Sequence, residues 1–432
     1  MKNKLLLSLF LACTLIYSAK SFAQVPNFMV PLPIAPESLP NTQPETLPHV
    51  PDIVLPYYLM KGVTYPISLL GNLIDGDPNK PKASKSKKKT FSEKYYIYPA
   101  IAFADGGRFG GGFGLAIPDL FNRNYILSLN TIVFTDLDFR GKVSIGKRDL
   151  FRIKDQRVSF LAGADWFMDS NEDYFGIGPN TEKNDKGEFS SKLLRVGGTL
   201  GFDLPQNLNI APHIALDWGK SSYKDIDSTP SVQNIFPASE LAGFNSTIAY
   251  ADFGFRFAHD TRDNIYYTQK GGVRSFIFQY MKGLNQKGFD YLVFRVKAEQ
   301  YFPLGYKGLV LWLNNGWTFA ESPDGNQIPF YRLPAIDLFA PVRGFSRGRF
   351  RDKSSVVANA ELRYPLWNNI DGTLFADTGR VFNGIEHFSF KDFQYSVGGG
   401  IRVTLKKYYT FKIEVGYGGE GANTVFEVIQ TF

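Results

Sequence analysis

Cysteine and histidine are scarce in this 432-residue sequence, which contains one of the former and four of the latter. The single cysteine, Cys13, lies near the amino end, so neither a disulfide framework nor a thiolate metal site is available to the rest of the chain. The histidines His49, His213, His259 and His387 are not spaced as metal ligands usually are. We therefore expect no metal site.

Long apolar runs are also missing. No stretch of about 18 apolar residues occurs, which excludes a helical membrane protein. Residues 5–17 are apolar but too short to span a bilayer, and they follow the positive charges of Lys2 and Lys4. Together with the small-x-small sequence Ser21-Phe22-Ala23, they predict a secretory signal peptide over residues 1–23, cleaved after Ala23. We expect the protein to be exported.

The excess of positive charge is small. The net charge is +7, and it falls to +4 once Lys2, Lys4 and Lys20 leave with the signal peptide. Acidic and basic residues are nearly balanced in residues 94–432, so the composition gives no reason to expect nucleic acid as a partner.

Proline is concentrated in residues 24–93, which hold 12 of the 25 prolines in the chain. Proline removes backbone donors and favours extended chain, so this region is predicted to be a largely unstructured linker rich in proline and lysine. Within it, residues 57–74 are apolar, and Ile67, Leu70 and Ile74 fall near helical spacing. We favour a patch that lies against the next domain, and a short plug helix is the alternative.

From residue 94 onward, segments of ten to sixteen residues alternate in polarity. The clearest example is residues 289–302, where one face carries Tyr291, Val293, Arg295, Lys297, Glu299 and Tyr301, and the other Leu292, Phe294, Val296 and Ala298. A charged inner face and an apolar outer face are typical of a membrane barrel and are the inverse of a soluble sandwich.

Sixteen such runs occur, at residues 94–104, 108–118, 123–135, 137–149, 155–169, 191–203, 207–222, 247–260, 270–282, 288–303, 306–320, 354–366, 369–382, 392–405, 408–419 and 422–432. An even number is expected for a single-chain antiparallel barrel of the outer membrane. Most runs exceed the ~9–11 residues that cross a bilayer at a tilt. The sequence therefore predicts an all-β, 16-stranded transmembrane β-barrel in residues 94–432.

The last run carries a pattern of its own. Phe426, Val428 and Phe432 share one face, which is the arrangement of a C-terminal insertion signal of outer-membrane barrels. Gln430 interrupts that face and weakens the signal without removing it.

The longest turn-like segment, residues 321–354, contains Arg343 between apolar neighbours and five basic residues from Arg343 to Lys353. One interpretation is a solvated extracellular loop. The other is an arginine that folds back into a polar cavity. Glu361 and Asp377, on the next two strands, should face the lumen because a carboxylate facing lipid is destabilising. An arginine–carboxylate pair is therefore within reach.

The same loop contains Gly344-Phe345-Ser346-Arg347-Gly348, which matches the nucleophile elbow of hydrolases. The elbow needs a helix after the serine and a histidine downstream, and the residues that follow show no helical period. We therefore assign no catalytic residue and expect no enzyme, with a lipid hydrolase in the barrel wall as the least favoured alternative. Alternating Gly110, Gly112 and Gly114 favour close approach by another segment, such as an inward-folded loop.

Five motifs carry a family resemblance. They are Val342-Arg343-Gly344-Phe345, Glu361-x-Arg363-x-Pro365, Phe375-x-Asp377-x-Gly379, Asp260-Thr261-Arg262-Asp263-Asn264 and Tyr174-Phe175-Gly176-Ile177-Gly178-Pro179. On these motifs residues 94–432 resemble the BamA/TamA-type outer-membrane barrel family, also called bacterial surface antigens. The resemblance implies a loop tucked inside the barrel, with Arg343 pairing with Asp377 and, as a second partner, Glu361.

The resemblance also implies a function in the bacterial outer membrane. Family members insert or secrete polypeptides through a weak seam between the first and last strands, and they use no ATP and no cofactor. The expected partners are outer-membrane lipids, exported polypeptide clients and a periplasmic partner. Residues 24–93 depart from the family, because they cannot form its periplasmic polypeptide-transport-associated repeats. A passive porin or a structural surface antigen is the alternative function.

Overall fold

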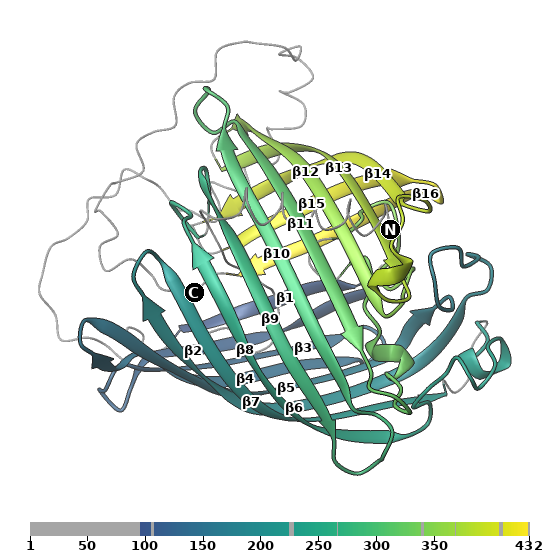
Figure 1. Ribbon diagram of the computed structural model, residues 1–432. Helices are drawn as coiled ribbons and strands as arrows, with labels where there is room; N and C mark the ends of the chain where they lie inside the picture. The colour runs from purple at the N-terminus through teal and green to yellow at the C-terminus, as the bar shows by residue number, and fades with distance from the viewer. Residues whose placement is uncertain are drawn as a thin grey trace, which may run out of the picture.

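The computed structural model describes residues 96–104, 108–223, 229–265, 267–337, 341–367, 369–405 and 409–430. In this part of the chain, sixteen antiparallel strands form one sheet in sequence order, curved into a barrel (Figure 1). The predicted signal peptide, the proline-rich linker with its plug-like segment, and Phe432 lie outside the described residues. None of the helices in the described part is long and apolar enough to cross a membrane.

The strands are β1 (Tyr96–Ala104), β2 (Arg108–Leu120), β3 (Tyr125–Phe134), β4 (Phe139–Ile153), β5 (Gln156–Tyr174), β6 (Gly187–Leu204), β7 (Leu208–Tyr223), β8 (Thr247–Asp260), β9 (Gly271–Gly283), β10 (Tyr291–Pro303), β11 (Val310–Glu321), β12 (Ser354–Trp367), β13 (Ile370–Phe382), β14 (Gln394–Leu405), β15 (Tyr409–Gly418) and β16 (Gly421–Gln430). Within the described part of the chain, three 3₁₀ turns accompany them, η3 (Val232–Asn234), η4 (Phe330–Arg332) and η5 (Ile385–His387). The predicted all-β fold and its sixteen strands are confirmed.

The largest difference from the sequence prediction lies in the β5–β6 hairpin. We expected its strands to end at residue 169 and to begin at residue 191, but pairing continues to Tyr174 and Gly187 after an irregularity between Asp169 and Glu172. The extension follows from packing, because Tyr174 and Phe189 are fully buried in a cluster with Phe330 of a distant loop. The alternation of polar and apolar residues along the two strands could not predict this contact with a distant loop.

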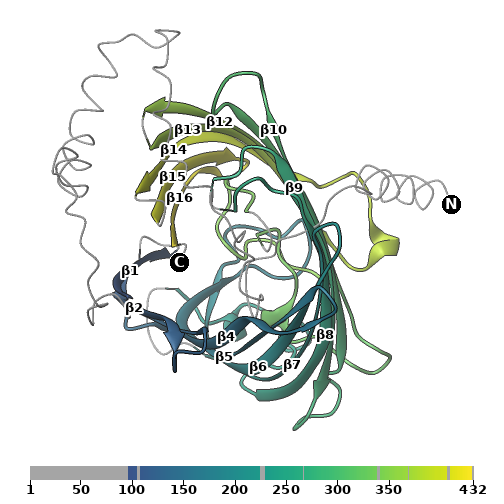
Figure 2. The same cartoon turned by 90° about the vertical axis from the view of Figure 1, so that its left-hand side faces the viewer.

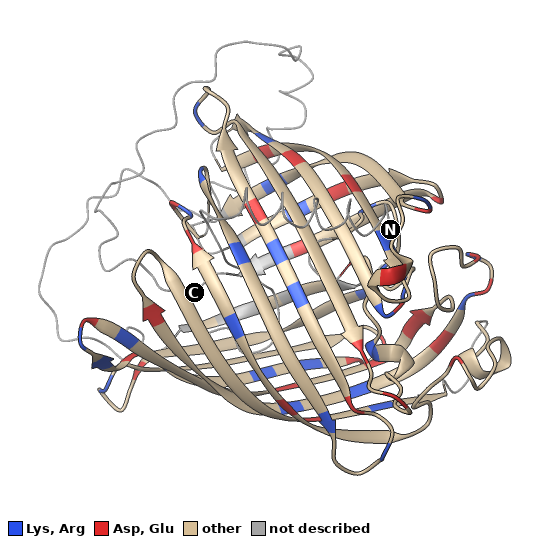
Figure 3. Ribbon diagram, viewed as in Figure 1, with Lys and Arg blue, Asp and Glu red and all other residues tan. Residues whose placement is uncertain are grey.

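Side chains alternate between the lumen and the outer surface. Asp165, Arg195 and Asp217 occupy one row across β5, β6 and β7, and Arg195 and Asp217 are buried inside the barrel. The intervening positions, such as Leu194 and Ile214, are apolar and exposed on the outer surface. Charged residues therefore occur in the middle of many strands (Figure 3). This is the pattern of a wall with lipid outside and polar groups inside.

β1 and β16 form the two ends of the sheet and lie next to each other (Figure 2). In the described residues, ladders of hydrogen bonds join each strand to its sequence neighbours, and no ladder joins β1 to β16. A strand edge without a ladder leaves backbone donors and acceptors available for pairing. The line between β1 and β16 is therefore the least strongly bonded line in the described wall.

The two ends of the barrel differ in the length of their connections. At one end the turns are short, as in residues 121–124 and 154–155, and at the other lie L3 (residues 175–186) and L6 (residues 322–353). Short turns face the periplasm in such barrels, and long loops face outward. L6 is the longest connection, and its green ribbon lies within the ring of strands in Figure 2.

The alternation predicts where a charge is tolerated. Ile214, in the middle of β7, is 57% exposed on the lipid-facing side. We expect Ile214→Arg to destabilise the barrel by about 2–4 kcal/mol, because the charge is placed at mid-bilayer depth. Tyr306, in the short turn after β10, is 40% exposed, and Tyr306→Arg should cost about 0–1 kcal/mol. Urea unfolding in lipid vesicles measures both, and equal costs would contradict this placement of the bilayer.

Candidate functional site: the arginine anchor of L6

Arg343 of L6 points into the barrel wall, and its side chain is 4% exposed. Its Nε donates to Asp377 Oδ2 at 2.9 Å, its Nη2 to Asp377 Oδ1 at 2.8 Å, and its backbone nitrogen to Asp377 Oδ2 at 3.0 Å. Nη1 donates to Glu361 Oε2 at 2.8 Å and to Glu414 Oε2 at 3.1 Å. The structure thus brings Arg343 together with Asp377 and Glu361, and adds Glu414.

Neighbouring side chains hold these carboxylates in place. Asn359 Nδ2 donates to Asp377 Oδ1 at 2.9 Å, and Ser396 Oγ donates to Asp377 Oδ2 at 3.2 Å. Arg402 Nη2 donates to Glu361 Oε1 at 2.8 Å and supplies a second cation. Burial alone would lower the pKa of Arg343, but the hydrogen bond and charge of Asp377, with the charges of Glu414 and Glu361, raise it above its ordinary value. The guanidinium is a permanent charge inside the barrel.

The Phe375-x-Asp377-x-Gly379 motif supplies three separate parts of this site. The ring of Phe375 lies under the guanidinium, with the Arg343 Cζ 3.4 Å from the ring centroid. Asp377 pairs with the guanidinium. A Cβ on Gly379 would lie 2.9 Å from Val342 Cγ2, so glycine leaves the space that Val342 occupies. Alternation places all three residues on the inner face of β13.

L6 also approaches the backbone of β15 closely. A Cβ on Gly416 would lie 2.6 Å from the carbonyl carbon and oxygen of Arg343, and one on Gly344 would lie 2.7 Å from the nitrogen of Gly418. We had expected Gly110, Gly112 and Gly114 to allow close approach by another segment, such as an inward-folded loop, and at Gly110 and Gly112 the segment that approaches most closely is a neighbouring strand. The atoms nearest to a Cβ at those positions belong to Ile132, Phe134 and Thr131 of the neighbouring strand β3.

Apolar contacts complete the attachment of L6. Val342 and Phe345 are buried in a cluster with Ile336, Phe350, Val357 and Val381. The rings of Phe345 and Phe350 meet edge to face at 5.4 Å. Each apolar side chain buried this way contributes roughly 1.5–3 kcal/mol, so both charge and apolar burial hold the loop.

The Tyr174–Pro179 motif, which begins at the end of β5, packs on L6. Gly178 donates its backbone N–H to the carbonyl of Arg351 at 2.8 Å, and Arg351 Nη2 donates to Glu172 Oε1 at 2.7 Å. Arg349 lies over the Phe175 ring at 4.7 Å and donates to both oxygens of Thr181 at 2.6 Å. Two of the basic residues of L6 thus bind L3 and the end of β5.

At the opposite end of the barrel, Arg363 lies against the β8–β9 turn, which the Asp260–Asn264 motif begins. The guanidinium of Arg363 lies 4.2 Å from the centroid of the Tyr267 ring and donates to the carbonyl of Thr268. Tyr267 in turn donates its hydroxyl to Asp371 at 3.0 Å. Arg363 therefore braces the β8–β9 turn and does not contribute to the Arg343 site.

The remaining predicted residues are distributed as follows. Ser346 lies in a turn of L6 that leads to strand β12, so the helix that a nucleophile elbow requires does not follow it. His213 contacts Asp252 at 3.3 Å on the inner wall, and His387 contacts Glu386 at 3.0 Å in the β13–β14 loop. Phe426 lies on β16 and is exposed, and Val428 lies on the same strand.

Sequence reasoning missed Glu414 and Asn423. Asn423 of β16 donates to the carbonyls of Arg343 and Phe345 at 3.0 and 3.1 Å. A signal for Glu414 was present, because it stands mid-strand in an apolar run and should face the lumen by the argument used for Glu361 and Asp377. Asn423 carries no such signal, since an amide is ordinary on either face near a strand end.

A β-wall curved into a barrel, with an apolar exterior, a charged interior and a loop held inside, defines an outer-membrane β-barrel protein. Residues 120–417 match the model of the Omp85 superfamily domain, so the chain belongs to the Omp85 superfamily. Members of this superfamily insert or translocate proteins at the outer membrane of Gram-negative bacteria. The predicted outer-membrane location and the family resemblance are confirmed.

One solved structure shows the same fold. The chain is similar to BamA from Haemophilus ducreyi lacking POTRA domains 1–3, with a TM-score of 0.57, 15% identity, and coverage of 85% of this chain and 78% of that one. It also matches CdiB from Acinetobacter baumannii, with a TM-score of 0.48, 13% identity, and coverage of 78% of this chain and 59% of that one. No curated protein sequence matches the chain.

The bare backbone of Gly416 is required if L6 is to stay in place. Gly416→Ala should shift L6 away from β15, because a methyl group would overlap the Arg343 carbonyl, and overpacking of this kind costs about 1–3 kcal/mol. Hydrogen exchange of amides 342–350 should become faster while exchange in β2–β5 stays slow. Gly419→Ala is the matched control, because a Cβ there meets nothing within 4 Å. Equal exchange in the two variants would show that the close approach is unimportant.

Proposed function

We propose that this barrel inserts or translocates polypeptides at the outer membrane, with L6 as the element that occupies the lumen and the β1–β16 line as the lateral exit. The observation that carries the proposal is the buried pairing of Arg343 with carboxylates of β12, β13 and β15. Removing one partner of a buried charge pair costs about 3–5 kcal/mol. The site therefore holds L6 in a fixed position inside the barrel, which a solvated loop would not need.

Contacts with the last strand support a coupling between L6 and the exit. Asn423 of β16 holds two carbonyls of L6, and Arg349 Nε donates to Glu420, in the turn before β16, at 2.8 Å. Lys412 of β15 pairs with Glu427 of β16 at 2.6 Å. A movement of L6 would therefore act directly on β16, one of the two strands at the β1–β16 line.

The rest of the chain fits this role as follows. We infer that residues 1–23 direct export, that residues 24–93 act as a tether or plug, and that residues 94–432 form the barrel. A linker of this composition offers no compact domain to capture a client. Clients would then be delivered by a separate periplasmic partner, and no catalytic residue, metal or cofactor takes part.

One observation favours a passive pore as the second candidate. A cavity of about 910 Å³ remains beside L6, with charged residues such as Arg108, Lys142 and Asp169 in its lining. A polar lumen of this kind is the usual path for small solutes through outer-membrane barrels. In this case L6 would narrow the channel without moving, and the Arg343 pairing would serve stability alone.

Arg343→Ala tests the proposal. Vesicles that contain the protein receive a small outer-membrane barrel protein diluted from urea, and its insertion is followed by heat-modifiable migration. We expect the wild type to accelerate insertion and Arg343→Ala to reduce the rate to that of empty vesicles, because L6 loses its three carboxylate contacts. Arg347→Ala is the control. The side chain of Arg347 is 66% exposed, and its substitution removes only a 3.8 Å contact with Asp337.

Arg343→Ala and Arg347→Ala must themselves stay heat-modifiable, because heat-modifiable migration shows that their barrels are folded. Insertion by Arg343→Ala at the wild-type rate would remove L6 from the mechanism. A wild type that inserts nothing but gives a large, steady current in planar bilayers, insensitive to changes at Arg343 and Asp377, would identify a passive pore.

A further inference from the structure

A second arginine of L6 is buried in the opposite part of the barrel wall. Arg332 ends the η4 turn, and its side chain is 11% exposed. Its Nη2 is hydrogen bonded to Asp217 Oδ1, and its Nη1 lies 3.4 Å from Asp217 Oδ2. Asp217 belongs to β7, and its side chain is 2% exposed. Like the pairing of Arg343 with Asp377, this contact joins one guanidinium to both oxygens of one carboxylate, but Arg332 uses Nη1 and Nη2 where Arg343 uses Nε and Nη2.

The surroundings of Arg332 repeat the other parts of the Arg343 site. An aromatic ring lies against the guanidinium, because the Arg332 Cζ is 5.0 Å from the centroid of Tyr250. A bare backbone position gives it room, since a Cβ on Gly219 would lie 2.5 Å from Arg332 Nη2. Asp217 and Gly219 are two residues apart on the inner face of β7, as Asp377 and Gly379 are on β13.

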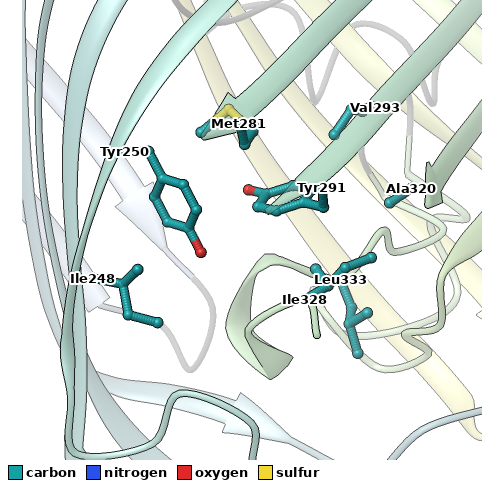
Figure 4. Close-up of a cluster of buried hydrophobic side chains, with 8 residues drawn as sticks. All are labelled: Ile248, Tyr250, Met281, Tyr291, Val293, Ala320, Ile328 and Leu333. Carbon is teal, nitrogen blue, oxygen red and sulfur yellow. The ribbon is translucent and has the colours of Figure 1, made fainter. Parts of the chain in front are cut away.

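Apolar side chains on both sides of Arg332 are buried as well. Ile328 and Leu333 pack in a cluster with Ile248, Tyr250, Met281 and Tyr291 from β8, β9 and β10 (Figure 4). Phe330 packs with Tyr174, Phe189 and Val232, and its ring meets that of Phe189 at 4.8 Å. Residues 328–333 of L6 are therefore attached to the wall from β5 to β10.

The two attachments lie on different parts of the barrel. Residues 328–333 contact β5–β10, whereas residues 342–350 contact β12, β13 and β15 and reach Asn423 of β16. We propose that Arg332 is a second anchor, so that L6 is a crossbar between the two halves of the wall, and that the Arg332 end is the one that is released. The role of release in transport rests on the proposed function, whereas the anchor itself does not.

The two ends differ in how completely they are bonded. Arg343 contacts three carboxylates, whereas Arg332 contacts one, which it shares with Arg195 at 3.4 Å. Among the described residues, the Nε of Arg332 and the hydroxyl of Tyr250 are buried without a protein hydrogen-bond partner, and no nitrogen of Arg343 is in that state. A buried donor without a partner reduces the net stability of a contact. The polar contacts at the Arg332 end are thus the weaker of the two sets, and this is the ground for placing release there.

Distance measurements between spin labels test the anchor without any client. In a full-length Cys13→Ser background, one label is placed at Asp155 in the turn before β5, and the second at Gln327 or at Arg347 of L6. Asp155, Gln327 and Arg347 are exposed, so labels are tolerated. We expect Arg332→Ala to broaden the 155–327 distance distribution and shift it to longer values, while the 155–347 distribution stays as in the wild type.

Two further variants separate a lost anchor from a damaged fold. Asp217→Asn keeps the shape of the residue but removes its charge, and it should broaden the 155–327 distribution as Arg332→Ala does. Tyr250→Phe keeps the ring and removes only a hydroxyl without a protein partner, so it should leave the distribution unchanged. The second anchor is refuted if both Arg332→Ala and Asp217→Asn keep the wild-type 155–327 distribution.

The order of release is measured with the wild type in rising urea. Broadening of the 155–327 distribution before the 155–347 distribution supports release at Arg332, and the reverse order overturns it. A changed 155–327 distribution in Arg332→Ala, with unchanged insertion of the test client, would support the anchor and count against a role of L6 in insertion. The two proposals can therefore fail separately.

Discussion

A buried guanidinium must have its charge balanced, and much of this structure follows from that requirement at Arg343. Its partners come from β12, β13 and β15, so the site exists only when these strands have their correct register. The loop in turn stays inside the barrel only while the site exists. Loop position and strand pairing therefore stabilise each other.

The sequence predicted the wall well because one physical rule acts at every strand. Lipid on one side and polar groups on the other force a period of two, and that period is visible without any partner strand. The same rule placed Glu361 and Asp377 on the inner face, and the preceding loop then put Arg343 near them. Each of these steps needs only local information and the order of the strands.

The parts that escaped prediction depend on contacts across the barrel. Glu414 and Asn423 join the site because β15 and β16 curve round to meet L6. The mid-strand position of Glu414 predicts only that it faces the lumen, and separations of 71 and 80 residues from Arg343 do not show that the two residues contact the loop. The longer β5–β6 hairpin depends on burial of Tyr174 and Phe189 under Phe330. Gly110 and Gly112 were misleading because a glycine is equally useful beside a neighbouring strand.

The sharing of carboxylates has a consequence for how this protein can change over evolutionary time. Glu361 is bonded to both Arg343 and Arg402, and Asp377 to Arg343, Asn359 and Ser396. A substitution at one of these positions leaves a neighbour with an uncompensated charge or donor, so its cost depends on what stands at the others. Such positions are epistatic: they drift as a group, whereas the apolar residues of the lipid-facing wall are free to exchange one at a time.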